Sequence, residues 1–185
     1  GADRRDLMSY VIVHSFWLAL AMAVVVGALA WFFAEPLLFL FTDDALILPL
    51  ANEYLRITAL GLVFTFCSVS ISAALNGIGD TKTPMLVMLL SNGLNIILDP
   101  LLIFGGLGLP ALGVLGAAWA TFLANALALL ILLAILFRRE ELGVTTLWVP
   151  LQPSITANIL KIGFPACLQS AARSSTGTVM FWLVM

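Results

Sequence analysis

The chain alternates between long uncharged apolar stretches and short polar segments. Asp, Glu, Lys and Arg are absent from residues 7–34, 57–79, 83–98 and 100–137. A transmembrane helix needs about 20 predominantly apolar residues, and each stretch can supply most of them. A fifth apolar stretch covers residues 155–185 and is interrupted only by Lys161 and Arg173. We therefore predict five transmembrane helices, near residues 8–34, 46–76, 84–104, 111–137 and 155–185.

The composition agrees with this pattern. Hydrophobic residues make up 62% of the 185 residues and charged residues only 10%, whereas a soluble domain has about 25% charged residues. We predict an all-α integral membrane protein whose main partner is the lipid bilayer. The net charge of −2 and the lack of a basic block argue against a nucleic-acid partner. Neither cysteine has the spacing to other Cys or His residues that a metal site needs.

The loop charges predict an orientation. If every helix crosses the membrane, two groups of segments lie on opposite sides: residues 1–7, 77–83 and 138–154 against residues 35–45 and 105–110. Basic residues occur only in the first group, as Arg4, Arg5, Lys82, Arg138 and Arg139. The positive-inside rule therefore predicts that the N-terminal end lies in the cytoplasm.

Asp99 is the most informative residue. It follows Pro84 by about 15 positions, or roughly 22 Å along a span of about 30 Å, which places it in the outer half of the membrane. A central Asp costs roughly 2.5 to 3.5 kcal/mol to insert, and the many apolar neighbours return a few tenths each, so the helix still inserts. Ionisable residues inside spans commonly mark ion or proton pathways.

Asp99 belongs to a polar stripe. Asn92 and Asn95 precede it at helical spacing, and Met88 lies on the same face. Such a stripe must face protein or water, and Pro100 adds a free backbone acceptor because it leaves the Ile96 carbonyl without its usual partner. Asp99 is thus a candidate to exchange a proton or bind a small cation. The alternative is a structural role in joining helices.

Two other predicted helices carry polar residues at helical spacing. The second contains Thr65, Ser68, Ser72 and Asn76, and the fourth contains Thr121 and Asn125. Ser and Thr also bond back to their own helix or serve close packing, so a cavity role and a packing role stay open. Glu53 and Arg56, three residues apart, are predicted to form a local ion pair.

Several segments together resemble a known family. These are residues 74–84 (ALNGIGDTKTP), 95–105 (NIILDPLLIFG) and 112–121 (LGVLGAAWAT), with shorter matches at 53–56 (EYLR) and 162–166 (IGFPA). In order and spacing they resemble multidrug and toxic compound extrusion (MATE) transporters, of the DinF-like branch. The five helices then correspond to family helices three to seven. The chain lacks an initial Met and a polar tail, so both ends look cut and the remainder of the polypeptide is expected elsewhere.

The resemblance implies a fold of 12 helices in two lobes around a central cavity. It assigns residues 1–137 to the N-terminal lobe, 138–154 to a cytoplasmic connection and 155–185 to the first helix of the C-terminal lobe. The implied function is secondary antiport in a bacterial inner (plasma) membrane, exporting cationic or amphipathic drugs or metabolites in exchange for H⁺ or Na⁺. No enzyme activity, metal or cofactor is implied.

The resemblance also assigns site residues. Asn95 and Asp99 match an Asn and an Asp one turn apart in the family's coupling-ion site. Thr121 would face the lobe cavity from the next helix and is assigned to the same site. The substrate cavity would be lined by Ser68, Ser72, Met88, Asn92 and Asn125.

Two other functions compete with this interpretation. A lipid-linked oligosaccharide flippase of the same superfamily shares the architecture, but it would line its cavity with basic residues to hold pyrophosphate. Residues 77–80 (GIGD) also satisfy the GxGD pattern of intramembrane aspartyl proteases. Asp80, however, stands in a Thr-Lys-Thr-Pro context typical of a solvated turn.

Overall fold

The computed structural model describes residues 2–39, 44, 47–106, 108, 110–139, 142–144, 146–148, 152–165 and 169. The chain divides into two compact units, Gly1–Leu147 and Trp148–Met185. The first unit holds four long helices: α1 (Ala2–Phe39), α2 (Ile47–Gly77), α3 (Lys82–Ile103) and α4 (Val114–Arg138). The second unit contains a helix over residues 153–165. The rest of the helix predicted over 155–185 falls outside the described residues, apart from residue 169.

All four helices of the first unit are long and apolar enough to cross a membrane. Their bounds confirm the predicted second, third and fourth helices to within three residues at each end. The first helix is longer than predicted and continues through Pro36. A proline removes one hydrogen bond from the helical ladder and its ring crowds the carbonyl one turn earlier, and here both effects fall at the end of α1, which finishes three residues later at Phe39. The chain is an all-α integral membrane protein.

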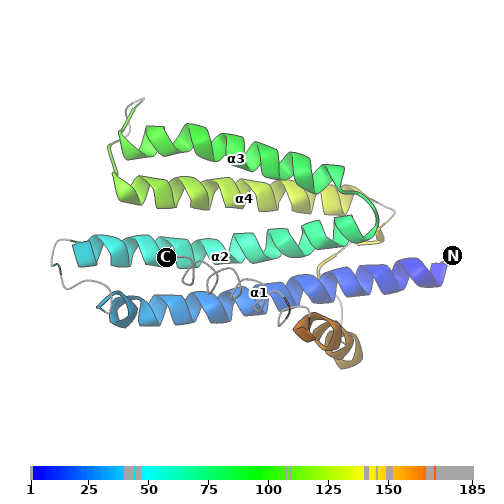
Figure 1. Ribbon diagram of the computed structural model, residues 1–185. Helices are drawn as coiled ribbons and strands as arrows, with labels where there is room; N and C mark the ends of the chain where they lie inside the picture. Colours follow the sequence, from blue (N-terminus) through cyan, green and yellow to red (C-terminus); the bar gives the residue numbers. More distant parts are fainter. Residues whose placement is uncertain are drawn as a thin grey trace, which may run out of the picture. The chain divides into compact units, whose positions relative to one another are not determined.

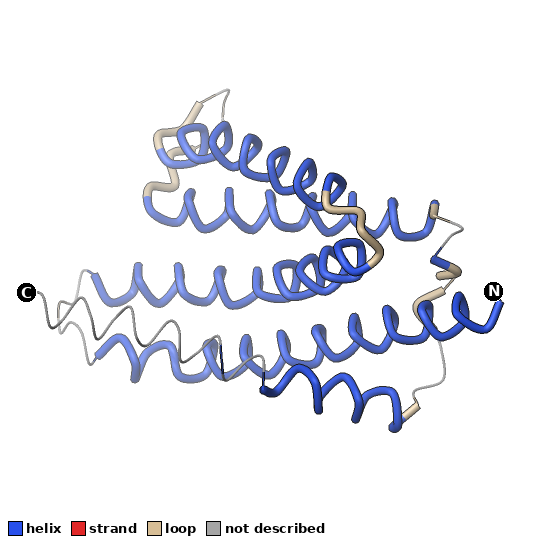
Figure 2. The backbone as a smooth tube through the Cα atoms, turned by 45° about the vertical axis from the view of Figure 1, so that its right-hand side comes forward, coloured by secondary structure: helices blue, strands red, loops and turns tan. Residues whose placement is uncertain are grey.

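Every regular element in the described part of the chain is a helix (Figure 2). Helices that are consecutive in sequence run in opposite directions, and the spatial order is α1, α2, α4, α3, so the neighbours α2 and α4 run in the same direction (Figure 1). Helix α4 therefore lies between α2 and α3, which are consecutive in sequence but touch only sparingly. We call the two ends of this unit the Lys82 end, where α3 begins, and the Glu35 end, where α1 finishes.

Small residues allow α3 and α4 to approach closely. The buried face of α4 consists largely of glycine and alanine: Gly116, Ala118, Ala120, Ala124 and Ala128. A Cβ atom at Gly116 would lie 2.5 Å from the carbonyl carbon and oxygen of Leu102. The Ser91 hydroxyl donates to the carbonyl of Ala124 at 3.0 Å. Close backbone packing and interhelical hydrogen bonds are the forces that hold helices together in lipid, where burial of apolar surface contributes little.

A polar cluster fixes the Lys82 end. Asp80, in the turn between α2 and α3, accepts hydrogen bonds from the Thr83 backbone N–H at 3.1 Å and the Thr83 hydroxyl at 2.6 Å. Arg139, directly after α4, forms an ion pair with Asp80 at 2.5 Å and donates to the Thr83 hydroxyl at 3.2 Å. The cluster therefore ties the α2–α3 turn to the end of α4.

The segment after α4 returns to α1. Leu142 and Val144 are buried, and the Trp17 indole donates to the carbonyl of Leu147 at 2.8 Å. The first part of the predicted connection thus packs within the first unit. Trp148 is 85% exposed.

The close approach at Gly116 gives a stability prediction. Gly116→Ala should lower the free energy of unfolding by about 1–3 kcal/mol, because the added methyl group overlaps backbone that cannot move aside cheaply. Thermal unfolding of the full-length protein in detergent measures this. Gly93→Ala is the matched control, since a Cβ there meets open space and alanine favours the helix by roughly 0.5–1 kcal/mol. Equal melting temperatures for the two variants would refute the packing argument.

Candidate functional site

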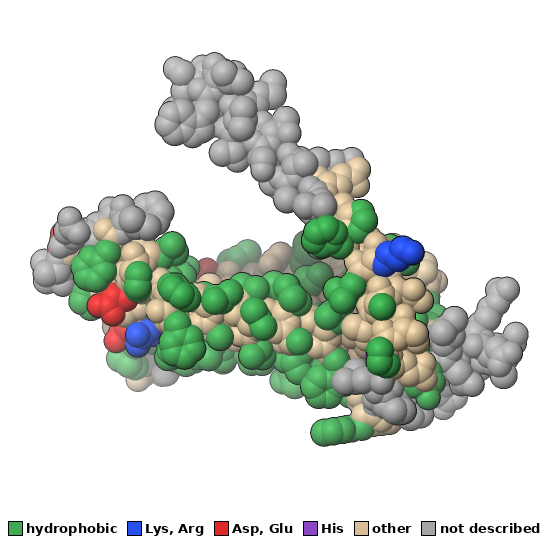
Figure 3. All heavy atoms as spheres, turned by 90° about the horizontal axis from the view of Figure 1, so that it is seen from below, with side chains coloured by type: hydrophobic (Ala, Val, Ile, Leu, Met, Phe, Trp, Pro, Cys, Tyr) green, Lys and Arg blue, Asp and Glu red, His purple; other side chains and the backbone are tan. Residues whose placement is uncertain are grey.

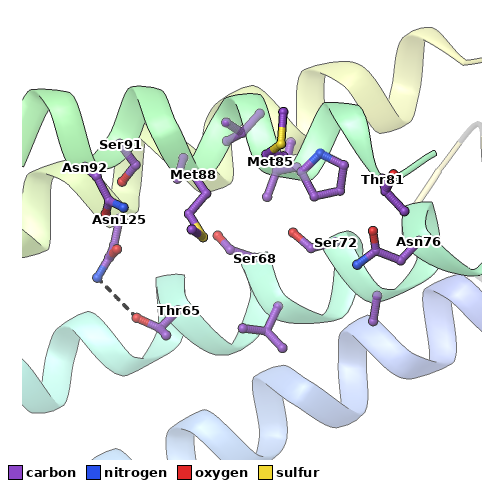
Figure 4. Close-up of a pocket in the computed structure, with 16 residues that line it drawn as sticks. Thr65, Ser68, Ser72, Asn76, Thr81, Met85, Met88, Ser91, Asn92 and Asn125 are labelled. Carbon is purple, nitrogen blue, oxygen red and sulfur yellow. Dashed lines mark hydrogen bonds between the residues drawn. The ribbon is translucent and has the colours of Figure 1, made fainter.

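A pocket lies between α2, α3 and α4 (Figure 4). Its volume is about 560 Å³, within the range of sites for small organic molecules. Polar side chains line it from all three helices: Thr65, Ser68, Ser72 and Asn76 from α2, Ser91 and Asn92 from α3, and Asn125 from α4. Met85 and Met88 enter from α3 (Figure 4). The pocket is amphipathic and opens to the surface at Val69, Met85 and Met88, which are exposed; we call it the chamber.

The structure brings the five predicted cavity residues together. Their side chains come from three different helices, and all of them line this one pocket: Ser68, Ser72, Met88, Asn92 and Asn125. Their role in binding a substrate stays a prediction. Sequence reasoning did not single out Met85 or Ser91, although both lie on the pocket face of α3 at helical spacing from Met88.

The pocket lining contains no charged side chain among the described residues. The buried hydroxyl oxygen of Ser68 has no hydrogen-bond partner. A buried polar atom without a partner costs about 1–3 kcal/mol, so a ligand that bonds to it would recover that cost. Methionine thioethers are polarisable and adapt to ligands of different shape. The chamber suits an amphipathic guest better than a highly charged one.

Asp99, Asn95 and Thr121 form a separate cluster toward the Glu35 end. The Asn95 carboxamide lies between α3 and α4 and can take two orientations. In one, its nitrogen donates to Thr121 Oγ1 at 3.3 Å. In the other, the nitrogen donates to Asp99 Oδ2 and the oxygen accepts from the Thr121 backbone N–H, both at 3.2 Å. The second orientation satisfies both ends of the amide, so we adopt it.

The second oxygen of the Asp99 carboxyl has no partner. Oδ1 is buried and accepts no hydrogen bond from the protein. A membrane interior offers little water to solvate such an atom. A proton or a small cation would supply the missing interaction, and carboxylate, amide and hydroxyl oxygens are ligands that hard cations favour. The geometry brings the three predicted coupling residues together, while ion binding itself stays a prediction.

The two groups of residues are linked through α4. Asn125 lies one turn after Thr121 and donates to Thr65 Oγ1 on α2 at 3.2 Å (Figure 4). Thr65 and Asn125 line the large pocket and also a smaller pocket of about 170 Å³, which reaches Thr121 and Tyr54. The Asn125–Thr65 hydrogen bond therefore lies between the chamber and the smaller pocket that reaches Thr121. Tyr54 was not among the predicted site residues, although it belongs to the EYLR match.

Asp80 takes a structural position. Its carboxylate is engaged by Thr83 and Arg139, as a turn residue would be. The two hydrogen bonds from Thr83, aided by the Arg139 charge, lower the pKa of the Asp80 carboxyl below its ordinary value of 3.8. Among the described residues, no group of three His, Cys, Asp or Glu side chains is placed to hold a metal ion.

The sequence matches a known family over more than half of its length. The family model MatE matches residues 1–101. The chain belongs to the MATE transporter family. MATE proteins are transporters and not enzymes, so the proposed intramembrane protease is excluded.

Relatives and solved structures agree with this assignment. "Probable multidrug resistance protein NorM" of Thermotoga maritima is 37% identical over 182 residues, which cover 98% of this chain and 39% of that protein. The structure described as "MATE in the bent conformation" has a TM-score of 0.82 at 30% identity, covering 94% of this chain and 38% of that one.

A further solved structure is an inward-facing "multidrug resistance MATE family transporter of the MOP superfamily". It has a TM-score of 0.77 at 31% identity, covering 89% of this chain and 37% of that one. The chain therefore spans about two fifths of the length of the relatives it matches.

The Asp80 cluster predicts a pH dependence. Because the folded-state pKa of Asp80 is lowered, its stabilising contribution is present above the ordinary carboxyl pKa and is lost as the pH falls through the folded-state pKa. Asp80→Asn should therefore lower the melting temperature at pH 7, and the difference from the unchanged protein should shrink under acid conditions. Glu53→Gln is the control, since Glu53 is exposed and lies outside the cluster. A difference for Asp80→Asn that does not change with pH would contradict the assignment.

Proposed function

We propose that this chain is part of a secondary active antiporter that exports cationic or amphipathic drugs or metabolites in exchange for H⁺ or Na⁺. The observation that carries the proposal is the buried, unpartnered Oδ1 atom of Asp99 in a membrane-spanning helix. Ionisable groups in such positions are costly and commonly serve ion transport. The MATE family membership and the relatives named as multidrug resistance proteins support the same function.

Asp99 is proposed to hold the coupling ion. A proton on Oδ1, or Na⁺ among the oxygens of Asp99, Asn95 and Thr121, would satisfy the carboxylate and remove its negative charge. A cationic substrate in the neighbouring chamber would favour the opposite state, with Asp99 charged and ion-free. Ion and substrate then disfavour each other, which is the reciprocal coupling that antiport requires.

The chamber suits the proposed substrates. Its neutral amides and hydroxyls can bond to the polar part of a drug, and its methionine and aliphatic side chains can pack on the apolar part. A lipid-linked oligosaccharide carrier would need cations to hold its pyrophosphate. The described lining contains neither Lys nor Arg, which favours the drug exporter over the flippase.

The proposed placement in the membrane follows the charges. Lys82, Arg138 and Arg139 gather at the Lys82 end, which we assign to the cytoplasm by the positive-inside rule. The chamber then lies toward the cytoplasm and Asp99 toward the outer side of a bacterial inner membrane. In the complete transporter, residues 1–137 would belong to the N-terminal lobe, 138–154 to the connection and 155–185 to the C-terminal lobe.

The proposal is tested by Asp99→Asn in the full-length protein. Amide nitrogen and oxygen replace the carboxylate with little change of shape, but the residue can no longer exchange a proton or offer a charge to Na⁺. Uphill, ion-driven export of ethidium in membrane vesicles should fall to the level of vesicles without the transporter.

The matched control is Glu35→Gln, which removes an exposed acidic residue at the same end of the helical unit. This variant should transport at the unchanged rate. Uphill export by Asp99→Asn, at an expression level equal to that of the control, would overturn the assignment of Asp99.

A further inference from the structure

The face of α2 that points away from the chamber carries its own pattern. Helical spacing places Asn52 and Arg56 one turn apart, with Leu60 and Val63 continuing the same side. This side lies roughly opposite the pocket face marked by Thr65. The face is therefore polar near the Glu35 end and apolar toward the middle of the membrane.

An apolar groove follows this face between α1 and α2. It has a volume of about 300 Å³ and is lined by Ala23, Val24, Gly27, Ala28, Trp31 and Phe32 of α1 and by Ala59, Leu60 and Val63 of α2. Small residues in its floor hollow the surface, while Phe32 and Leu60 are 78% and 51% exposed at its sides. Hydrophobic side chains cover much of the face shown in Figure 3, and most of the charged side chains visible there lie near its ends.

A cation with an unused donor stands at one end of the groove. The Arg56 guanidinium lies over the ring of Trp31, 5.0 Å from its centroid, and Trp31 also lines the groove. The ion pair predicted between Arg56 and Glu53 does not form among the described residues. The Nε–H group of Arg56 is buried without an acceptor. Stacking on an indole leaves the edge of a guanidinium free to bind an oxyanion.

A complementary acceptor lies one helical turn away. Oδ1 of Asn52 is buried and receives no hydrogen bond. The site thus offers a ligand one hydrogen-bond donor, the Arg56 Nε–H group, and one neutral acceptor, Asn52 Oδ1. The surrounding charge is acidic, because the described charged residues toward this end are Glu35, Asp44, Glu53 and Asp99 against Arg56 alone.

The site lies within reach of the lipid headgroups. Arg56 is about 14 Å from the start of α2, and α2, with 31 residues, exceeds the roughly 30 Å hydrocarbon core by about 16 Å in total. With α2 centred in the membrane, the hydrocarbon core begins about 8 Å from the start of the helix, so Arg56 lies about 6 Å inside it. From this depth the long Arg side chain can reach the headgroups, where Trp and Arg side chains anchor membrane proteins.

We propose that the α1–α2 groove binds one phosphatidylethanolamine molecule, with an acyl chain in the groove, the phosphate on Arg56 and the ammonium group directed toward Asn52. The phosphate supplies the acceptor that Arg56 lacks, and the ammonium group supplies the donor that Asn52 lacks. A zwitterionic headgroup also suits an acidic surrounding better than an anionic one. This assignment is independent of the proposed transport function.

Native mass spectrometry of the full-length protein, titrated in detergent with dioleoyl phosphatidylethanolamine, tests the proposal. Arg56→Gln should bind the most tightly held lipid about tenfold more weakly or worse, as expected for loss of a charge-assisted hydrogen bond. Arg138→Gln, which removes an exposed Arg at the opposite end, should bind as the unchanged protein does. Dioleoyl phosphatidylglycerol should bind less tightly than phosphatidylethanolamine.

A second variant keeps the test decisive if Arg56→Gln does not fold. Leu60→Trp keeps Arg56 and Asn52 but fills the groove, so it should also release the tightly held lipid. Equal lipid retention in Arg56→Gln, or in Leu60→Trp, would overturn the proposal and would be the result if another helix of the transporter covers the groove. Phosphatidylglycerol binding as tightly as phosphatidylethanolamine would overturn the assignment of the headgroup.

Discussion

The structure depends on one constraint: inside a lipid bilayer, polar groups must find their partners within the protein. Helices satisfy the backbone, and the polar side chains of α2, α3 and α4 then have to face one another. Ser91 bonds to the Ala124 carbonyl, and Asn125 bonds to Thr65. The same constraint gathers most of the other polar side chains of these three helices in the chamber and in the Asp99 cluster, because lipid tails cannot hydrogen-bond to them. The candidate site therefore forms where the three helices bury their polar side chains.

The chamber and the Asp99 cluster are adjacent because the same two helices build both. On α3, Asn92 lines the chamber and Asn95 contacts Asp99 one turn later. On α4, Thr121 and Asn125 stand in the same relation. Under the proposed function, a change in the charge of Asp99 would act first on Asn95 and Thr121, and through one helical turn on the Asn125–Thr65 hydrogen bond. On the opposite face of α2, Arg56 lies over Trp31. The proposed lipid site and the chamber therefore lie on different sides of this helix.

Much of this arrangement could be predicted from the sequence. Long uncharged stretches define helices, and the spacing of Asn92, Asn95 and Asp99 defines one face. The spatial order of the helices could not be predicted from periodicity, because it depends on close contacts such as Gly116 against Leu102, whose partners lie far apart in the chain. Arg56 was wrongly paired with Glu53, since spacing alone cannot show that a neighbouring helix brings Trp31 over the guanidinium. Likewise, sequence spacing could not predict that Arg139, directly after α4, forms an ion pair with Asp80.

The central claim is that the charge state of Asp99 and occupation of the chamber oppose each other. The most direct measurement is the affinity of the purified full-length transporter for tetraphenylphosphonium, a lipophilic cation, as pH and Na⁺ concentration are varied. The account predicts that affinity falls as H⁺ or Na⁺ rises, and that this dependence disappears in Asp99→Asn. The same dependence in Asp99→Asn and in the unchanged protein would contradict it.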